Sequence, residues 1–176
     1  MNLCLYGASS ENINEIYKKE VQLLGRLMAG RGHALIFGGG ASGLMGAAAR
    51  GVFSGGGKII GVSPNFFNVD GILFDKCTEL IYTETMRERK QVMEDLSDAC
   101  IVMPGSFGTM DELFTYACNR AIDKHAKPIF IFNFEGYYDP LKQLLENMQE
   151  AGFMKPVMAG AICFCDTIEE IIALLK

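Results

Sequence analysis

Arg89 is a candidate for contact with an anionic ligand, because its position in the sequence is unusual for a cationic side chain. A helix is expected to begin near Thr85, and the helix macrodipole disfavours a cation in the first turns by about 0.3–1 kcal/mol. Arg89, Met93 and Leu96 are spaced i, i+4 and i+7, which places the arginine on the apolar face of that helix. A bound anion would resolve the conflict, whereas the alternative is an arginine whose stem packs while its head group reaches water. We favour an arginine that faces a ligand.

A possible acid–base partner follows in the stretch MPGSFGTMDE, residues 103–112. Thr109 and Glu112 have the spacing of a capping box, in which the threonine caps a helix and the glutamate reaches back to its backbone N–H. The same spacing recurs at residues 85–88 and 167–170, where nothing else suggests chemistry. The residues alone therefore leave two roles open for Glu112, a helix cap and a catalytic carboxylate.

Three loops of small residues could hold an anion close to these side chains. They are GASS with Ser9, GGGASGLMG with Gly38, Gly39 and Gly40, and PGSFGT at residues 104–109. Each is expected where a strand passes into a helix, and free backbone N–H groups at a helix start favour phosphate. The second loop also contains G-x-G-x-x-G, but the next strand ends in IIGVSPN without the acid that a dinucleotide fingerprint needs. A nicotinamide-dependent dehydrogenase is therefore a minor alternative, and tight helix packing is the structural explanation of the later glycines.

Short apolar runs alternate with longer helical patterns along the chain, which predicts an α/β fold. We expect a Rossmann-like, doubly wound parallel sheet in three layers, α/β/α, forming a single nucleotide-binding domain over residues 1–176. The expected strands are 3–6, 34–37, 58–62, 99–103, 129–132 and 162–164, and the expected helices are 13–30, 43–54, 86–97, 110–122, 138–151 and 168–175. Residues 63–78 are expected to form a long loop, and long loops often carry function.

Composition excludes several classes of protein. The net charge is −5 and no basic stripe is present, so a nucleic-acid partner is not expected. No apolar run reaches the ~18 residues of a membrane span and no signal peptide is evident, so we expect no membrane partner and a cytoplasmic location. The six cysteines form no CxxC pair, and the two histidines, His33 and His125, lack ligand spacing, so no metal site is expected.

Several of these segments resemble, in order and separation, the Lonely Guy family of cytokinin riboside 5′-monophosphate phosphoribohydrolases. The resemblance covers most of the chain from Leu3 to Phe153. It is carried by GGGASGLMG, IIGVSP, MRERKQVMEDLSDACIVMPGSFGTMDEL, KPIFIFN, GYYDPL and AGF. Members of this family have also been labelled possible lysine decarboxylases, but no lysine here suggests a pyridoxal phosphate site, and no cofactor is expected.

The resemblance implies a homodimeric enzyme that cleaves the N-glycosidic bond of an N6-modified purine nucleoside 5′-monophosphate, giving the free base and ribose 5-phosphate. It places the catalytic arginine on Arg89 and the catalytic glutamate on Glu112. The implied substrate contacts are Lys90, Gly105, Ser106, Phe107, Gly108, Thr109, Met110 and Asp111.

Two positions depart from the family pattern. Ser106 replaces the second glycine of the P-G-G-x-G-T motif, and Arg87 replaces a histidine. A serine would be strained at a positive φ angle, or its hydroxyl would add a phosphate ligand. The alternative from another functional class is a non-enzymatic carrier of a nucleotide or of the molybdenum cofactor, which has no need for the pairing of Arg89 with Glu112.

Overall fold

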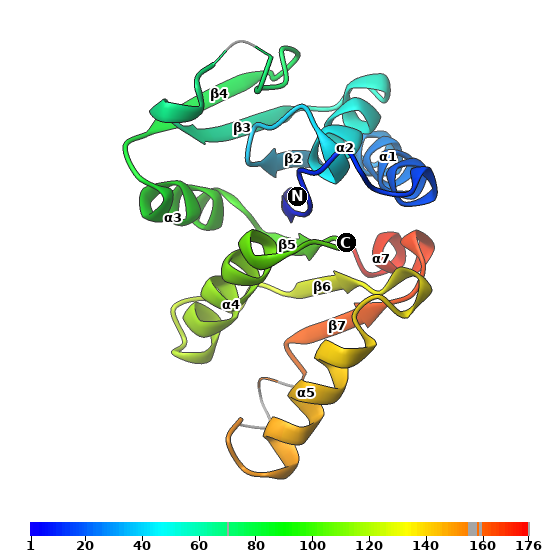
Figure 1. Ribbon diagram of the computed structural model, residues 1–176, viewed down its shortest axis with the longest axis vertical. Coiled ribbons are helices and arrows are strands. Elements are labelled where there is room, and N and C mark those ends of the chain that lie inside the picture. Colours follow the sequence, from blue (N-terminus) through cyan, green and yellow to red (C-terminus); the bar gives the residue numbers. More distant parts are fainter. Residues whose placement is uncertain (70, 155–157, 159, 176) are drawn as a thin grey trace.

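A parallel sheet runs through the centre of the computed structural model, which describes residues 1–69, 71–154, 158 and 160–175 (Figure 1). The strands are β1 (Asn2–Tyr6), β2 (Ala34–Phe37), β3 (Ile59–Pro64), β4 (Glu79–Thr83), β5 (Ala99–Val102), β6 (Ile129–Phe132) and β7 (Ile162–Cys165). The helices are α1 (Glu15–Gly30), α2 (Gly43–Ser54), α3 (Met86–Leu96), α4 (Phe107–Ala121), α5 (Asp139–Glu150) and α7 (Ile168–Leu174), with short 3₁₀ turns η1 (Asn65–Phe67) and η2 (Phe134–Gly136).

The strand order is β4-β3-β2-β1-β5-β6-β7, and each neighbouring pair is parallel. From β1 the chain builds outward through β2, β3 and β4, then returns to the other side of β1 and builds outward again from β5. This order confirms the predicted doubly wound, Rossmann-like sheet. The winding reverses between β1 and β5, and ligands of such sheets bind beyond the carboxyl ends of the strands at that switch point.

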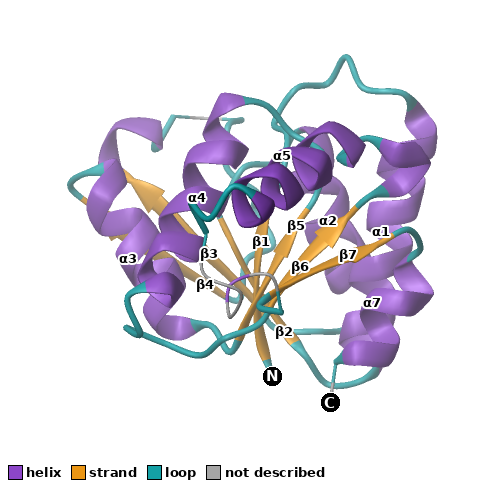
Figure 2. Cartoon of the chain, turned by 90° about the horizontal axis from the view of Figure 1, so that it is seen from below, coloured by secondary structure: helices purple, strands orange, loops and turns teal. Residues whose placement is uncertain are grey.

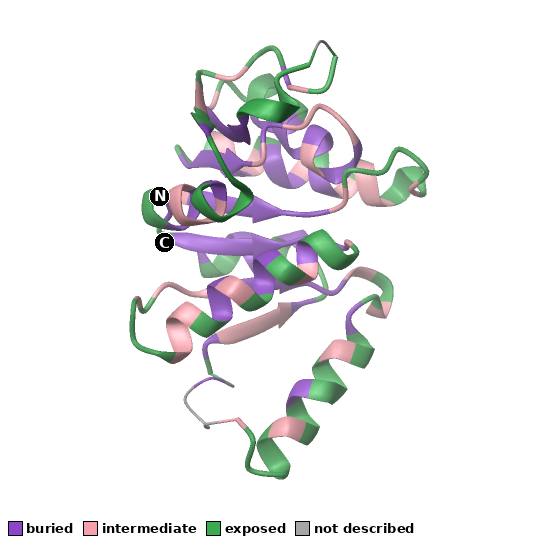
Figure 3. Cartoon of the chain, turned by 60° about the vertical axis from the view of Figure 1, so that its left-hand side comes forward, coloured by how far each residue is buried: buried purple, intermediate pink, exposed green. Residues whose placement is uncertain are grey.

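Helices cover both faces of the sheet, as predicted. Successive strand residues point to opposite faces, so Leu3 and Leu5 pack with α1, α2 and α7, whereas Cys4 and Tyr6 pack with α3 and α4. Figures 1 and 2 show these two groups of helices on opposite sides of the strands, and Figure 2 shows α5 on the same side as α3 and α4. Burial is concentrated in the central strands, while α5 exposes much of its surface (Figure 3). The three-layer prediction is therefore confirmed.

The prediction for residues 63–78 was incomplete, and one strand was missed. β3 extends to Pro64, the turn η1 follows, and Leu73 forms a bridge with Gly40. The next segment, ELIYT, is β4, which pairs with β3 at the edge of the sheet. An edge strand is not covered on both sides, so its residues need not form the continuous apolar run that identified the central strands.

The predicted start of α4 was also wrong. The helix begins at Phe107 with Ser106 as its N-cap, so Thr109 lies inside the first turn and caps nothing. The two other threonines of this pattern do cap their helices: Thr85 and Thr167 accept hydrogen bonds from the backbone N–H groups of Glu88 and Glu170. The carboxylate of the third glutamate is thus available for another contact.

Helices α1 and α2 cross with their backbones almost touching. A Cβ atom on Gly51 would lie 2.1 Å from the carbonyl oxygen of Gln22, and one on Gly25 would lie 2.4 Å from the carbonyl oxygen of Ala48. Both positions are free of side chains because backbone atoms cannot move aside. This crossing fixes α2, whose first residue follows the glycine loop after β2.

We predict that Gly51→Ala lowers the free energy of unfolding by about 1–3 kcal/mol, because the added methyl group overpacks a rigid crossing. Thermal unfolding measures this loss. The matched control is Gly30→Ala at the end of α1, where a Cβ atom would meet nothing within 4 Å. There alanine should be neutral or stabilising because it has a higher helix propensity than glycine. Equal melting temperatures for Gly51→Ala and the parent protein would contradict the packing argument.

Candidate active site

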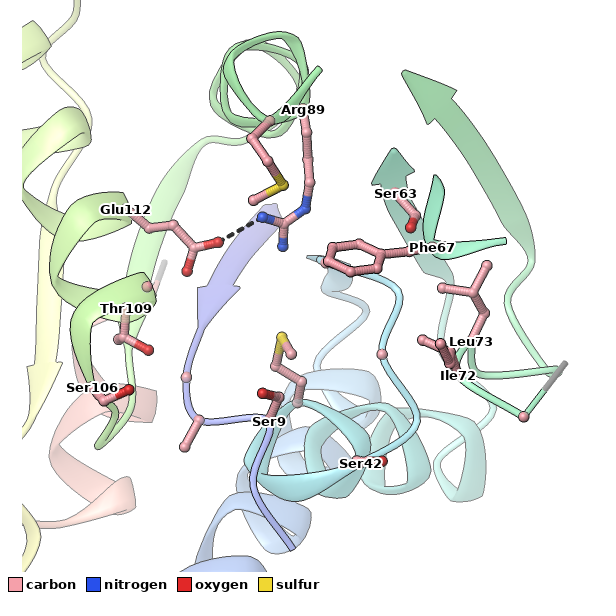
Figure 4. A pocket seen from close by; sticks show the side chains of 18 residues that line it. Ser9, Ser42, Ser63, Phe67, Ile72, Leu73, Arg89, Ser106, Thr109 and Glu112 are labelled. Carbon is pink, nitrogen blue, oxygen red and sulfur yellow. Dashed lines mark hydrogen bonds and ion pairs between the residues drawn. The ribbon is translucent and has the colours of Figure 1, made fainter. Parts of the chain in front are cut away.

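A cavity of about 490 Å³ lies at the switch point, beyond the carboxyl ends of the strands. Its lining comes from the loops after β1, β2, β3 and β5 and from the helices α2, α3 and α4. Figure 4 shows side chains from these elements converging on one space. The lining residues are Gly7, Ala8, Ser9, Gly38, Gly40, Ser42, Met45, Ser63, Phe67, Gly71, Ile72, Leu73, Met86, Arg89, Ser106, Gly108, Thr109 and Glu112.

Arg89 enters the cavity from α3 and is held at both ends of its guanidinium group. Nε donates a hydrogen bond of 3.1 Å to the carbonyl oxygen of Val62 in β3, and Nη1 donates one of 2.8 Å to Oε1 of Glu112. The residue is buried, with Met93 one turn further along α3 in the core. The prediction that Arg89 lies on the buried face of its helix is confirmed.

Glu112 is the buried carboxylate that pairs with this arginine in the cavity (Figure 4). Burial raises the pKa of Glu112 above its ordinary value, although the positive charge of Arg89 acts in the opposite direction. The charge of Asp111, its neighbour in the chain, raises the pKa further. A carboxylate with a raised pKa is a stronger base than an ordinary glutamate.

Gly38 has a clear geometric role beside this pair. A Cβ atom at Gly38 would lie 2.0 Å from Nη2 of Arg89 and 3.1 Å from its Cζ. The guanidinium group cannot easily move away, because Val62 and Glu112 already hold it. The bare backbone of the loop after β2 therefore makes room for the arginine as well as lining the cavity.

The N-terminus of α4 forms another side of the cavity. Ser106, Gly108 and Thr109 line it there, opposite Ser9 of the loop after β1. The first N–H groups of a helix have no partner within the helix, so they can bind an anion. Ser106 has a φ of −108°, so the strain considered for a serine at this position does not arise. In the part of the chain that the structure describes, the Ser106 hydroxyl caps no backbone N–H of α4, and the residue is exposed.

Lys90, a predicted substrate contact, points away from this cavity. Its Nζ donates hydrogen bonds to both carboxylate oxygens of Asp111, at 3.0 and 2.8 Å, and to the hydroxyl of Thr115 at 3.0 Å. These contacts join α3 to α4 on the outer side of the two helices, where Lys90 lines a separate surface groove. Lys90 and Asp111 thus hold in register the two helices that carry Arg89 and Glu112.

The other predicted contacts fall into two groups. The cavity brings together Arg89, Glu112, Ser106, Gly108, Thr109, Gly38, Gly40 and Ser9, and its lining does not include Lys90, Gly39, Gly105, Phe107, Met110 or Asp111. Gly39 adopts a φ of 80°, and its carbonyl accepts a hydrogen bond from Phe74. Gly105 lines an adjoining cavity, Phe107 is 93% exposed, and Met110 packs against the core under α3 and α4.

Sequence reasoning missed the apolar wall of the cavity. Phe67, Ile72 and Leu73 come from the segment after β3 and lie opposite Ser106, Thr109 and Glu112 (Figure 4). Met45 and Met86 add to the apolar lining. The available signal was the concentration of apolar residues in a segment without strand or helix periodicity, since such residues need either a core or a ligand to cover them.

The described residues contain neither a cluster of metal ligands nor a helix that could span a membrane. In residues 1–69, 71–154, 158 and 160–175, no group of three or more His, Cys, Asp or Glu side chains is placed to hold a metal ion. Within the same ranges, the helices all fall short of the length and apolar character that crossing a membrane requires.

The amino-acid sequence is similar to known proteins over most of its length. The family model described as possible lysine decarboxylase matches residues 45–175. A cytokinin riboside 5′-monophosphate phosphoribohydrolase from Mycobacterium tuberculosis is 35% identical over 168 residues, covering 96% of this chain and 89% of the relative. A protein of the same name from Arabidopsis thaliana is 32% identical over 174 residues, covering 99% and 82%.

Solved structures show the same fold at lower sequence identity. The molybdenum cofactor binding protein from Rippkaea orientalis matches with a TM-score of 0.75 at 22% identity, covering 99% of this chain and 94% of that one. The molybdenum cofactor carrier protein from Chlamydomonas reinhardtii matches with a TM-score of 0.75 at 20% identity, covering 99% and 95%. Since the family model and the sequence relatives span most of the molecule, the chain belongs to the family of possible lysine decarboxylases, the Lonely Guy family to which the phosphoribohydrolases belong.

Proposed function

We propose that this protein hydrolyses the N-glycosidic bond of a purine nucleoside 5′-monophosphate, releasing the free base and ribose 5-phosphate. The observation that carries the proposal is the buried pair of Arg89 and Glu112 in a cavity that also contains the N-terminus of α4. The carboxylate supplies negative charge at the reacting carbon, and the helix start suits a phosphate. The names of the relatives support the same reaction.

The proposed reaction needs stabilised positive charge on the ribose. As the bond from C1′ to the base nitrogen breaks, C1′ gains oxocarbenium character, which the carboxylate of Glu112 stabilises. Glu112 also orients the water and accepts one of its protons as the water oxygen bonds to C1′. The leaving base nitrogen takes up a proton from solvent, so that one water molecule is added in total across the broken bond. Arg89 fixes the carboxylate and offers its remaining N–H groups to the leaving base or the phosphoribosyl group.

The base is proposed to lie against the apolar wall of Phe67, Ile72 and Leu73, because the phosphate end of the cavity is polar. A planar purine with an apolar substituent buries its surface there. A cytokinin riboside 5′-monophosphate has this character, and it is the substrate that the names of the relatives suggest.

The alternative of a non-enzymatic carrier rests on fold alone, since the carriers are less than 25% identical to this chain. A carrier gains nothing from a carboxylate that is buried beside the phosphate site. A buried charge is costly unless it is paired, and one that also repels a bound anion would weaken the binding that a carrier needs. The Glu112 side chain therefore favours the enzyme.

The first test is to incubate the protein with adenosine monophosphate or N6-isopentenyl-adenosine monophosphate and to measure the released base by chromatography. We predict that Glu112→Gln lowers turnover by ~10²-fold or more, because glutamine cannot act as the base or stabilise positive charge as a carboxylate does. The amide oxygen can still accept the hydrogen bond from Arg89, so melting temperatures serve as a check on folding. The unphosphorylated nucleosides should be turned over far more slowly.

Glu170→Gln is the matched control for this substitution. Glu170 occupies the same T-x-x-E pattern at the start of α7, where it accepts a hydrogen bond from the backbone N–H of Asp166. Its replacement should leave base release unchanged. If Glu112→Gln turns over at the parental rate, Glu112 is not catalytic and the proposal fails.

The pH dependence of turnover is expected to show the raised pKa of Glu112. Since the carboxylate form is the active one, kcat should fall as the pH drops through this pKa, above the ordinary glutamate value of about 4.3. Asp111→Asn removes a negative charge that raises this pKa, so the acid limb should move to lower pH. A pH–rate profile of both proteins measures the shift. An unchanged or upward-shifted limb in Asp111→Asn would contradict the assignment of the limb to Glu112.

We also propose that the protein forms a homodimer, as the family resemblance implies, and that the exposed apolar side chains on the outer side of α4 form the contact. Phe107, Phe114 and Ile122 are 93%, 38% and 73% exposed along this side. Burial of these side chains against a second copy removes apolar surface from water. Light scattering on a sizing column should give a dimer mass for the parent protein and a monomer mass for Phe114→Asp. The control is Phe153→Asp, at a phenylalanine that lies outside α4 and is 88% exposed; this variant should remain dimeric. A monomer mass for the parent protein would contradict the proposal.

A further inference from the structure

A second cavity, of about 390 Å³, adjoins the candidate active site. It lies between the loop after β1, the first turn of α1 and the segment that follows β5. Tyr17, Ile13 and Leu44 form part of its walls, and Tyr137 closes another side, with its hydroxyl donating a 2.8 Å hydrogen bond to the carbonyl oxygen of Gly105. Nothing in the proposed reaction uses this space.

The two cavities meet at the predicted phosphate site. Ala8, Ser9 and Ser106 line both of them. Ser106 is the N-cap of α4, so the unpaired N–H groups of the first turn lie at this junction. A phosphate bound there would have the apolar wall of the active site on one side and Tyr17 and Tyr137 on the other. The second cavity therefore continues the site beyond the phosphate.

The position of the two cavities agrees with the winding of the sheet. Both cavities are lined by residues that follow β1 and by residues that follow β5. The active-site cavity adds residues from the segments after β2 and β3, whereas the second cavity adds Tyr137, which follows β6. From the switch point between β1 and β5, the active-site cavity thus extends toward β2 and β3, and the second cavity extends toward β6. Doubly wound sheets bind dinucleotides across this point, with the phosphates at the centre and one nucleoside on each side.

We propose that the site accepts nucleoside 5′-phosphates whose phosphate is joined to a second ring-bearing group, and that this group lies in the second cavity. The inference rests on the proposed function for the placing of the phosphate. Two tyrosines offer aromatic surface to a planar ring. The residues that line the second cavity, all in the described part of the chain, include no Lys, Arg or His. The ring is therefore an uncharged or cationic one, such as a nucleobase or a pyridinium.

The test compares the dissociation constants of adenosine monophosphate, of NAD⁺ and of adenylyl-(3′→5′)-adenosine by calorimetry. The two larger ligands carry the second ring through a pyrophosphate and through a phosphodiester, so the tighter one identifies the linkage. The titrations use the Glu112→Gln protein, which prevents the proposed turnover from consuming the ligands. We expect at least one larger ligand to bind about tenfold or more tightly than adenosine monophosphate, as one stacked base provides.

Tyr17 supplies the variants that locate the second ring. Tyr17→Ala should abolish the gain in affinity, while Tyr17→Phe, which keeps the ring, should retain it. Both should leave the affinity for adenosine monophosphate unchanged, since Tyr17 lines only the second cavity. Equal affinities for all three ligands, or a gain that survives Tyr17→Ala, would overturn the inference.

The proposed function is tested separately, by base release from adenosine monophosphate with the parent protein. If that protein releases no base while the tighter binding and its dependence on Tyr17 remain, the proposed reaction is wrong and the inference stands. If base is released and the larger ligands gain nothing, the inference is wrong and the proposed reaction stands.

Discussion

The contact between Arg89 and Glu112 is the interaction on which the rest of the site depends. Each side chain is buried, and a buried charge without its partner costs several kcal/mol. Neither residue could occupy its place alone. The pair therefore requires α3 and α4 to lie at a fixed separation, the carbonyl of Val62 to accept from the guanidinium group, and Gly38 to leave space for it.

The sheet topology provides these conditions. α3 follows the edge strand β4, whereas α4 follows β5 on the far side of β1, so the two helices meet only because the winding reverses between them. Lys90 then joins the helices on their outer side through Asp111 and Thr115. Residues adjacent in the chain thus have different tasks: Arg89 faces the cavity, and Lys90 holds its walls together.

The central part of the fold was predictable because it depends on local patterns. Five of the predicted strands are short apolar runs that are buried on both faces, and the sixth, β7 at the sheet edge, is an apolar run that is only partly buried. Arg89 lies on a helical period with Met93. β4 was not predicted, because this edge strand does not form the continuous apolar run that identified the other strands. The start of α4 was misplaced because Thr109 and Glu112 imitate a capping box. Only the tertiary contact with Arg89 distinguishes the two roles of the glutamate, and no spacing along the chain reveals such a contact.

The apolar wall was not predicted. Phe67, Ile72 and Leu73 belong to a segment whose apolar content was a signal, but its lack of regular periodicity did not show where these side chains point. Its origin has an evolutionary consequence. The chemical groups stand on α3 and α4, whose positions the core dictates, whereas the shape of the opposite wall depends on one peripheral connection after β3. Substitutions in that connection can change the shape of the cavity while leaving the charged pair in place. Under the proposed function, members of one family can thus diverge in the base they select without any change at Arg89 and Glu112.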